Sequence, residues 1–209
     1  IVGVVLGARL IYVLFYNLPF YFGNPLEIFA LWHGGLSFHG GLAGAVIAGY
    51  LFCKKKKIEF YDLADIAVIP VALALVLGRL GNLANAELYG RITNVPWCVD
   101  YSKSQFAEVP SGCRHPSQVY ASVKNFIIFA ALWSIKDKKL PKGLMFWSFV
   151  ALYGLFRTIV ELFRAPDEQI GFILNYFTMG QLLSFPLFLL GVYMLFRIKR
   201  IEHTKSKNP

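Results

Sequence analysis

The residues of this chain that could do chemistry are polar and ionisable side chains set in, or at the ends of, apolar segments. They are Arg9, His39, Arg79, Glu87, Lys124, Arg157, Glu161 and Arg164. A central arginine in a membrane span costs about 2.5–3.5 kcal/mol to insert, so such residues usually face a bundle interior or an aqueous cavity. We interpret them as candidates for one site. Lys124 is the exception, because a long lysine near a helix end can extend to the membrane surface.

The densest group is the run GRLGNLANAELYGR at 78–91, which follows a long apolar stretch. If the helix continues, Arg79, Asn82 and Asn85 are three residues apart and share one face. The two glycines of the run leave space for a close neighbour or a ligand. For any single residue, interhelical hydrogen bonding is the structural alternative. For the group as a whole, we favour a functional cavity.

A second group surrounds His39, which has a glycine pair on each side in HGGLSFHGGL at 33–42. An imidazole titrates near neutrality, so it can act as a general base or donate to a phosphate. A buried histidine satisfied by one neighbour is the structural alternative.

A third group is Arg157, Glu161 and Arg164. Residues 157 and 161 are one helical turn apart and can pair, and 161 and 164 are also neighbours on a helix surface. A purely structural ion pair is one interpretation. The other is a phosphate site, because the planar fork of an arginine suits phosphate and carboxylate groups.

Together, arginines, a histidine, amides and a carboxylate in a membrane cavity suit an anionic lipid headgroup. Arginine neutralises phosphate, including the charge that develops on a leaving group. Either His39 or Glu161 could remove a proton from a nucleophile. The three cysteines, at 53, 98 and 113, match neither a zinc nor a haem spacing, so we expect no metal chemistry.

The elements that must position these residues are membrane spans. The chain is 56% hydrophobic with a mean hydropathy of +0.53, which is too apolar for a soluble domain. A span needs about 20 mostly apolar residues. Six candidates are present, at 1–16, 37–53, 65–83, 118–135, 144–163 and 178–197. We therefore expect an all-α, polytopic membrane bundle that forms a single domain over 1–209.

The net charge of +9 resides mainly in three clusters, at 54–57, 136–142 and 197–207, which hold 13 of the 21 Lys and Arg residues. Clusters that flank spans indicate cytoplasmic loops and argue against nucleic-acid binding. Strict alternation then puts 17–36, 84–117 and 164–177 outside, with 84–117 as an outer loop or small periplasmic head. The candidate residues fall toward that outer face.

The run 78–91 resembles the signature of the prolipoprotein diacylglyceryl transferase family, approximately G-R-x-G-N-F-x-N-x-E-x-x-G, with Leu83 where Phe is usual. Four other segments resemble family motifs in the same order. They are Gly7 to Tyr16, Ser37 to Gly41, His115 to Tyr120 and Gly154 to Arg164. The resemblance covers almost the whole chain. It implies seven spans, with segment 1–16 as the second, so we expect a first span before Ile1.

The resemblance implies transfer of the diacylglyceryl group of phosphatidylglycerol to the lipobox cysteine thiol in a preprolipoprotein signal peptide, at the bacterial inner membrane. It implies no metal or nucleotide cofactor. Catalytic roles fall on His39, Arg79, Arg157 and Glu161, with His39 as the candidate base and the two arginines on the lipid phosphate. Substrate-binding roles fall on Arg9, Asn82, Asn85, Glu87, Gly90, His115 and Arg164.

Two other function classes fit a charged membrane cavity. A transporter or binding protein for an anionic lipid or small anion would move its substrate without a covalent product. A structural membrane subunit would tolerate substitution of the polar residues. Separately, Cys98 and Cys113 share the outer loop and could form a disulfide in an oxidising compartment, or remain as two thiols.

Overall fold

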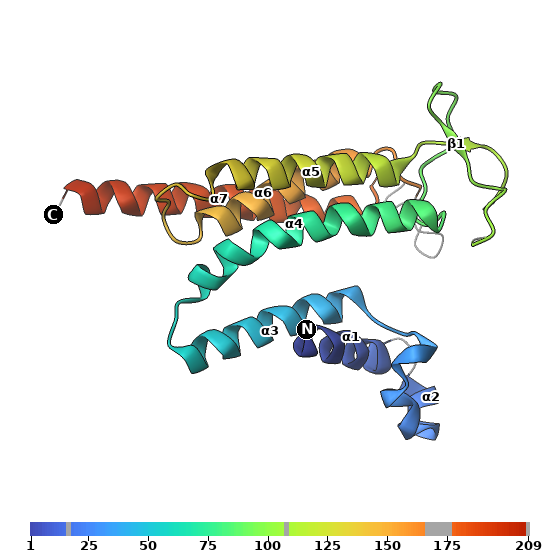
Figure 1. The fold of residues 1–209 in the computed structure, drawn as a ribbon, viewed down its shortest axis with the longest axis horizontal. Coiled ribbons are helices and arrows are strands. Elements are labelled where there is room, and N and C mark those ends of the chain that lie inside the picture. The colour runs from blue at the N-terminus through green and yellow to red at the C-terminus, as the bar shows by residue number, and fades with distance from the viewer. Residues whose placement is uncertain (16–17, 107–108, 166–176, 208–209) are drawn as a thin grey trace. The chain divides into compact units, whose positions relative to one another are not determined.

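The computed structural model describes residues 1–209 except 16–17, 107–108, 166–176 and 208–209, and except the side chains of 38, 39, 203 and 205–207 (Figure 1). His39, the candidate base, therefore has a described backbone, which is helical, but its side chain lies outside the described residues. The chain forms two compact units, Ile1–Leu63 and Ala64–Pro209, and each is described by itself.

Six long helices coincide with the six expected spans, which confirms the helical membrane fold among the described residues. They are α1 (Val2–Phe15), α3 (Phe38–Lys56), α4 (Phe60–Ala84), α5 (Ser117–Ile135), α6 (Leu144–Val160) and α7 (Met179–Lys207). Helices α4, α5 and α7 are long and apolar enough to cross a membrane, and α1 and α6 are shorter apolar helices.

In unit 1, glycines let α1 and α3 pack with their backbones in contact. A Cβ on Gly7 would collide with the carbonyl of Gly40, and one on Gly44 would collide with that of Gly3. These four residues form two Gly-x-x-x-Gly pairs, 3–7 and 40–44. Small residues at this spacing are typical of close helix pairs in membranes. Gly40, one of the glycines that flank His39, thus has a packing role.

Short helices join α1 to α3: α2 (Leu18–Gly23) and the 3₁₀ helices η1 (Pro25–Phe29) and η2 (Leu31–His33). The guanidinium of buried Arg9 in α1 holds the last part of this connection. It donates to the backbone carbonyls of Glu27, Ile28, Ala30, Gly34 and Gly35. One side chain thus binds five carbonyl oxygens, of which those of Glu27 and Ala30 also accept a backbone N–H group.

In unit 2, helices α4 to α7 lie side by side around an apolar core (Figure 1). The core side chains are Val68, Ala72, Ile128, Leu132 and Met145. Polar contacts add to this packing. The Asp65 carboxylate accepts from the backbone N–H groups of Gly143 (2.6 Å) and Phe146 (2.8 Å), which caps the start of α6. Asn125 of α5 donates to the Leu75 carbonyl of α4 at 3.1 Å.

The segment between α4 and α5 carries a small antiparallel pair, β1 (Val99–Asp100) and β2 (Cys113–Arg114). A disulfide joins Cys98 to Cys113 beside this pair. The segment also pairs with the chain that follows α6, through a bridge between Gly90 and Arg164. This second contact fastens one end of the segment close to Glu161.

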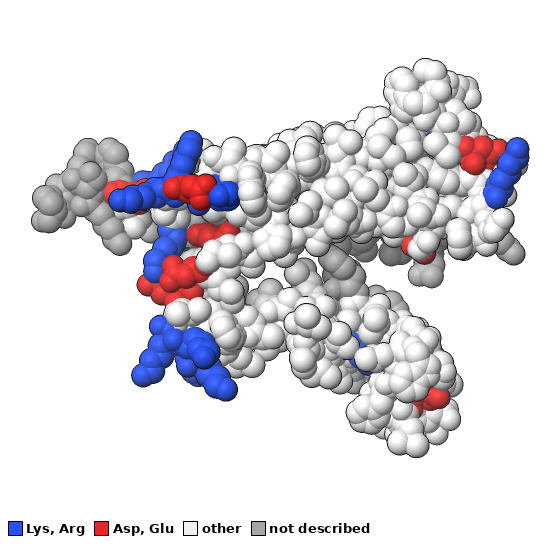
Figure 2. All heavy atoms as spheres, in the orientation of Figure 1, with Lys and Arg blue, Asp and Glu red and all other residues white. Residues whose placement is uncertain are grey.

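Charge is distributed unevenly along unit 2. Figure 2 shows most of the visible Lys and Arg of this unit at the end where the α5–α6 loop and the C-terminal part of α7 lie, away from β1. In unit 1, the lysine run at 54–57 is at the C-terminal end of α3. Within each unit, the basic cluster and the segment expected outside are therefore at opposite ends of the helices.

Candidate functional site

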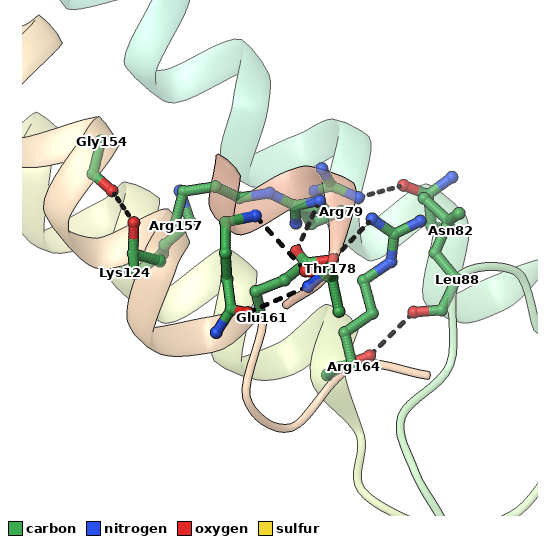
Figure 3. Close-up of polar contacts among 12 residues, drawn as sticks. Arg79, Asn82, Leu88, Lys124, Gly154, Arg157, Glu161, Arg164 and Thr178 are labelled. Atoms are coloured by element: carbon green, nitrogen blue, oxygen red, sulfur yellow. Dashed lines mark hydrogen bonds and ion pairs between the residues drawn. The ribbon is translucent and has the colours of Figure 1, made fainter. Parts of the chain in front are cut away.

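The Glu161 carboxylate, directly after α6, is the centre of the polar cluster in unit 2 (Figure 3). Its side chain is 3% exposed. Its Oε2 lies 2.8 Å from Nη2 of Arg157, and its Oε1 lies 3.6 Å from Nη1 of Arg164. These are the i,i+4 and i,i+3 pairs that the sequence spacing predicts. The structure thus brings these three predicted residues together.

Arg79 of α4 joins this group from another helix. It lies close enough to Arg157, Arg164 and Glu161 to interact electrostatically with each. Its Nη1 donates to Oδ1 of Asn82 at 3.5 Å, three residues further along the same helix. Asn82 in turn donates through Nδ2 to Oε2 of Glu87 at 2.9 Å. A continuous line of polar contacts therefore leads from the buried cluster to the exposed carboxylate of Glu87.

A tight turn brings Glu87 back to Asn82. The residues on either side, Ala86 and Leu88, both have φ of 55°, a left-handed conformation that costs non-glycine residues about 1–2 kcal/mol. Two side chains at the start of α5 hold the turn: Gln118 donates to the Glu87 carbonyl at 2.7 Å and Ser117 to the Leu88 carbonyl at 2.8 Å. The motif from His115 to Tyr120 contains Ser117 and Gln118, but its sequence did not predict that they hold this turn.

Lys124 does not extend to the membrane surface, and that expectation is wrong. Its side chain is buried in the bundle, and the residue is 5% exposed. The Nζ lies 3.9 Å from the centre of the Tyr153 ring and donates to Oδ1 of Asn125 at 2.8 Å. It also lies within electrostatic range of Arg157 and Arg79. The aromatic face and the amide replace the water that this ammonium group would otherwise require.

The cluster carries more positive than negative charge among the described residues. Three arginines, Arg79, Arg157 and Arg164, surround Glu161, which is the acidic side chain that contacts them, and the Lys124 amine lies within electrostatic range of Arg79 and Arg157. Buried charges are costly unless they are compensated. An excess of cations inside a membrane bundle therefore favours an anionic ligand, and guanidinium groups suit a phosphate.

The predicted glycines of α4, and Asn85 directly after it, have open surroundings. A Cβ on Gly78 or Gly81 would meet no described atom within 4 Å. Both residues and Asn85 are exposed, and they follow one another along the chain at spacings of three and four residues, with Asn85 just beyond the end of α4 at Ala84. This face is therefore accessible to a large ligand in unit 2.

Gly90 and His115 have structural surroundings. Gly90 lies between two chain segments, where a Cβ would come within 2.6 Å of the His115 Cβ and 2.7 Å of the Phe163 carbonyl. The His115 ring packs edge-on against Phe163 and its Nδ1 lies 3.2 Å from the Tyr120 hydroxyl. That hydroxyl also accepts from Nε1 of Trp97 at 2.6 Å. Both predicted residues thus connect the segment between α4 and α5 to the helices.

Arg9 and His39 belong to unit 1. All three nitrogens of the Arg9 guanidinium donate to backbone carbonyls, and its cation also lies 5.2 Å from the centre of the Tyr21 ring. In this structure the Arg9 guanidinium therefore binds the connection between α1 and α3, and its role toward a substrate stays a prediction. The His39 backbone lies in the first turn of α3.

Comparison with known proteins points to one family. The family model described as "Prolipoprotein diacylglyceryl transferase" matches residues 1–197. Relatives named "Phosphatidylglycerol--prolipoprotein diacylglyceryl transferase" include one from Geobacter sulfurreducens, 50% identical over 200 residues, with 95% of this chain and 75% of the relative covered. One from Desulfotalea psychrophila is 46% identical over 94% of this chain and 73% of its own length. One from Rickettsia rickettsii is 47% identical, with 93% and 75% covered.

Proposed function

The chain belongs to the prolipoprotein diacylglyceryl transferase family, and from this premise we propose that its buried cationic cluster holds the phosphate of the lipid substrate. The names of its relatives state the reaction: a diacylglyceryl group passes from phosphatidylglycerol to a prolipoprotein. The chain is therefore a membrane transferase with these two substrates. The comparisons give no support to a transporter.

The proposed chemistry is a displacement at the glyceryl carbon that bears the phosphate. The sulfur of the lipobox cysteine in the signal peptide attacks this carbon, a C–S thioether bond forms, and the C–O bond to phosphate breaks. Glycerol 1-phosphate leaves with the bonding electron pair, and the thiol proton passes to a base. Negative charge therefore grows on the phosphate in the transition state, where nearby cations lower the barrier.

The observation that carries this assignment is the charge imbalance around Glu161. Arg79 and Arg157 come from different helices and are close enough to interact electrostatically, although like charges repel. A phosphate between or beside them removes that repulsion and accepts hydrogen bonds from both guanidinium groups. Lys124 and Arg164 add to the positive potential.

Other roles follow from the contacts. Glu161 holds the Arg157 guanidinium through the 2.8 Å ion pair, so we assign it to orientation of that arginine. Asn82 and Glu87, linked at 2.9 Å, lie at the exposed end of the line of polar contacts and suit the hydroxyl groups of a glycerol headgroup. Asn85 is exposed, like Gly78 and Gly81, so we assign it to substrate binding. His39 is the proposed base, because an imidazole accepts a thiol proton near neutral pH.

We also propose the orientation in the membrane. The protein is a membrane protein, and its basic helix ends favour the cytoplasmic side of a bacterial inner membrane. The disulfide Cys98–Cys113 lies at the opposite end of unit 2, and disulfides persist in oxidising compartments such as the periplasm. Both features support a site toward the outer face.

The experiment that tests the function uses full-length protein in vesicles of phosphatidylglycerol with a peptide that carries a lipobox cysteine. We expect the peptide to gain the mass of one diacylglyceryl group, and glycerol phosphate to appear in equal amount. A peptide with serine in place of the cysteine is the control and gains nothing. Lipid movement between leaflets without a peptide product would contradict the proposal.

A further inference from the structure

A glycine in the first turn of α7 forms one wall of the Glu161 site. A Cβ built on Gly180 would lie 2.6 Å from Cδ of Glu161 and 2.7 Å from each carboxylate oxygen. Nearly equal distances to these three atoms mean that the carboxylate presents its flat face to the Cα of Gly180. Carbon atoms in contact normally stay about 3.5–4.0 Å apart. Any larger residue at position 180 therefore requires the carboxylate to move by about 1 Å.

The backbone itself does not require this glycine. The φ of Gly180 lies outside the left-handed region, since it is not among the glycines with positive φ. A glycine in a helix is less stable than an alanine at the same position. The chain accepts this cost at the position where the carboxylate packs, so the reason for the glycine is the space it leaves.

A reciprocal pair of hydrogen bonds fixes the turn that contains Gly180. The Thr178 N–H donates to Oε1 of Gln181 at 3.1 Å, and the Gln181 N–H donates to Oγ1 of Thr178 at 3.3 Å. This is a capping box, which defines where a helix begins. Thr178 lies beside the carboxylate of Glu161 in Figure 3. The positive end of the α7 dipole thus faces a buried anion, which is favourable.

We propose that Gly180 is a positioning residue for the transfer reaction, with the Thr178–Gln181 capping box as its support. The Glu161 carboxylate is held between the first turn of α7 on one side and the Arg157 guanidinium, 2.8 Å away, on the other. Gly180 therefore sets the position of Arg157 through Glu161 and does not itself touch the substrate. This inference rests on the proposed function of Arg157.

The test compares two glycines of the same helix. Gly180→Ala should lower kcat by about 10- to 100-fold, the effect of a displacement near 1 Å in an active site. Gly191→Ala is the matched control: its Cβ would lie 2.7 Å from the Ala151 nitrogen, at the same α6–α7 interface but three turns from the site. We expect Gly191→Ala to lower thermal stability while folded protein keeps its kcat.

A second substitution separates positioning from general damage. Glu161→Asp shortens the side chain by one methylene, so its carboxylate withdraws from a Cβ at position 180. We expect Gly180→Ala to cost nothing further in this background, both in kcat and in the thermal midpoint. The proposal would be overturned by any of three results. Gly180→Ala could keep full activity, Gly191→Ala could lose kcat to the same extent, or Gly180→Ala could lower kcat and the thermal midpoint equally with Glu161 and with Asp at position 161. The thermal midpoints of wild type, the two single variants and the double variant test the contact between Gly180 and Glu161 without any activity measurement. A wild-type protein that transfers no lipid would contradict the proposed function and not this contact.

Discussion

Arg157 and Glu161 are one helical turn apart at the end of α6, and their charged atoms meet at 2.8 Å where Glu161 is 3% exposed. The pair is a link between two halves of the site. On one side, Glu161 packs against the first turn of α7. On the other, Arg157 faces the cations that α4 and α5 supply. The fold thus converts a local i,i+4 spacing into a contact among four helices.

Breaking this pair should affect stability and activity differently. Arg157→Ala leaves the buried Glu161 without its nearest cation, and loss of one member of a buried pair costs about 3–5 kcal/mol. We expect a lower thermal midpoint and at least 100-fold slower transfer. Arg157→Ala/Glu161→Ala removes both charges, so the midpoint should recover while transfer stays slow. Fluorescence-monitored unfolding in detergent measures the first effect, and additive losses of stability would contradict a paired role.

Lys124 should contribute to lipid binding. Lys124→Met keeps most of the length and the apolar stem of the side chain but removes the buried amine. We expect the KM for phosphatidylglycerol to rise about 3- to 10-fold, because the positive potential of the cluster falls. The thermal midpoint should stay the same or increase, since a costly buried charge is lost. Steady-state kinetics at varied lipid fraction in mixed micelles gives the KM, and an unchanged value would exclude Lys124 from the site.

The glycine contact between α1 and α3 should be sensitive to side-chain size. Gly44→Val places a branched side chain against the Gly3 carbonyl and the Gly7 Cα, so it should separate the two helices. Gly23→Val is the matched control, because a Cβ at Gly23 meets no described atom within 4 Å. The yield of monodisperse protein after size-exclusion chromatography should drop only for Gly44→Val. Equal yields would show that the close packing is dispensable.

The disulfide should stabilise the segment between α4 and α5. By the chain-entropy model, a closed loop of about 15 residues contributes roughly 3 kcal/mol. Cys98→Ser/Cys113→Ser should therefore lower the thermal midpoint by about 6–12 °C. When wild-type protein is alkylated before reduction, mass spectrometry should find Cys98 and Cys113 unmodified. Alkylation of either one under non-reducing conditions would show that the bond is absent.

The sequence predicted the helices and the local pairs well, because both depend on residues close along the chain. The six predicted segments became helices, of which α4, α5 and α7 are long and apolar enough to cross a membrane. The spacing of Arg157, Glu161 and Arg164 predicted their contacts because all three follow one helical surface. The shared face of Arg79 and Asn82 became a hydrogen bond for the same reason.

Features that depend on partners far along the chain escaped prediction. The burial of Lys124 depends on Tyr153, on another helix, which supplies an aromatic face. The carbonyls bound to Arg9 come from residues 27–35, whose path no spacing rule describes. Gly180 is one glycine among 18 until the structure places it against Glu161. In each case the residue type was visible but its neighbour was not.

The central claim is that the cationic cluster binds the lipid phosphate during transfer. The most direct measurement is the mass of a lipobox peptide after incubation with wild type, Arg79→Ala, Arg157→Ala and Lys138→Ala in phosphatidylglycerol vesicles. Lys138→Ala removes the same charge from an exposed loop at the opposite end of unit 2. We predict a diacylglyceryl adduct with wild type and Lys138→Ala and loss of at least 99% of it with the two arginine variants. Equal adduct from all four proteins would contradict the account.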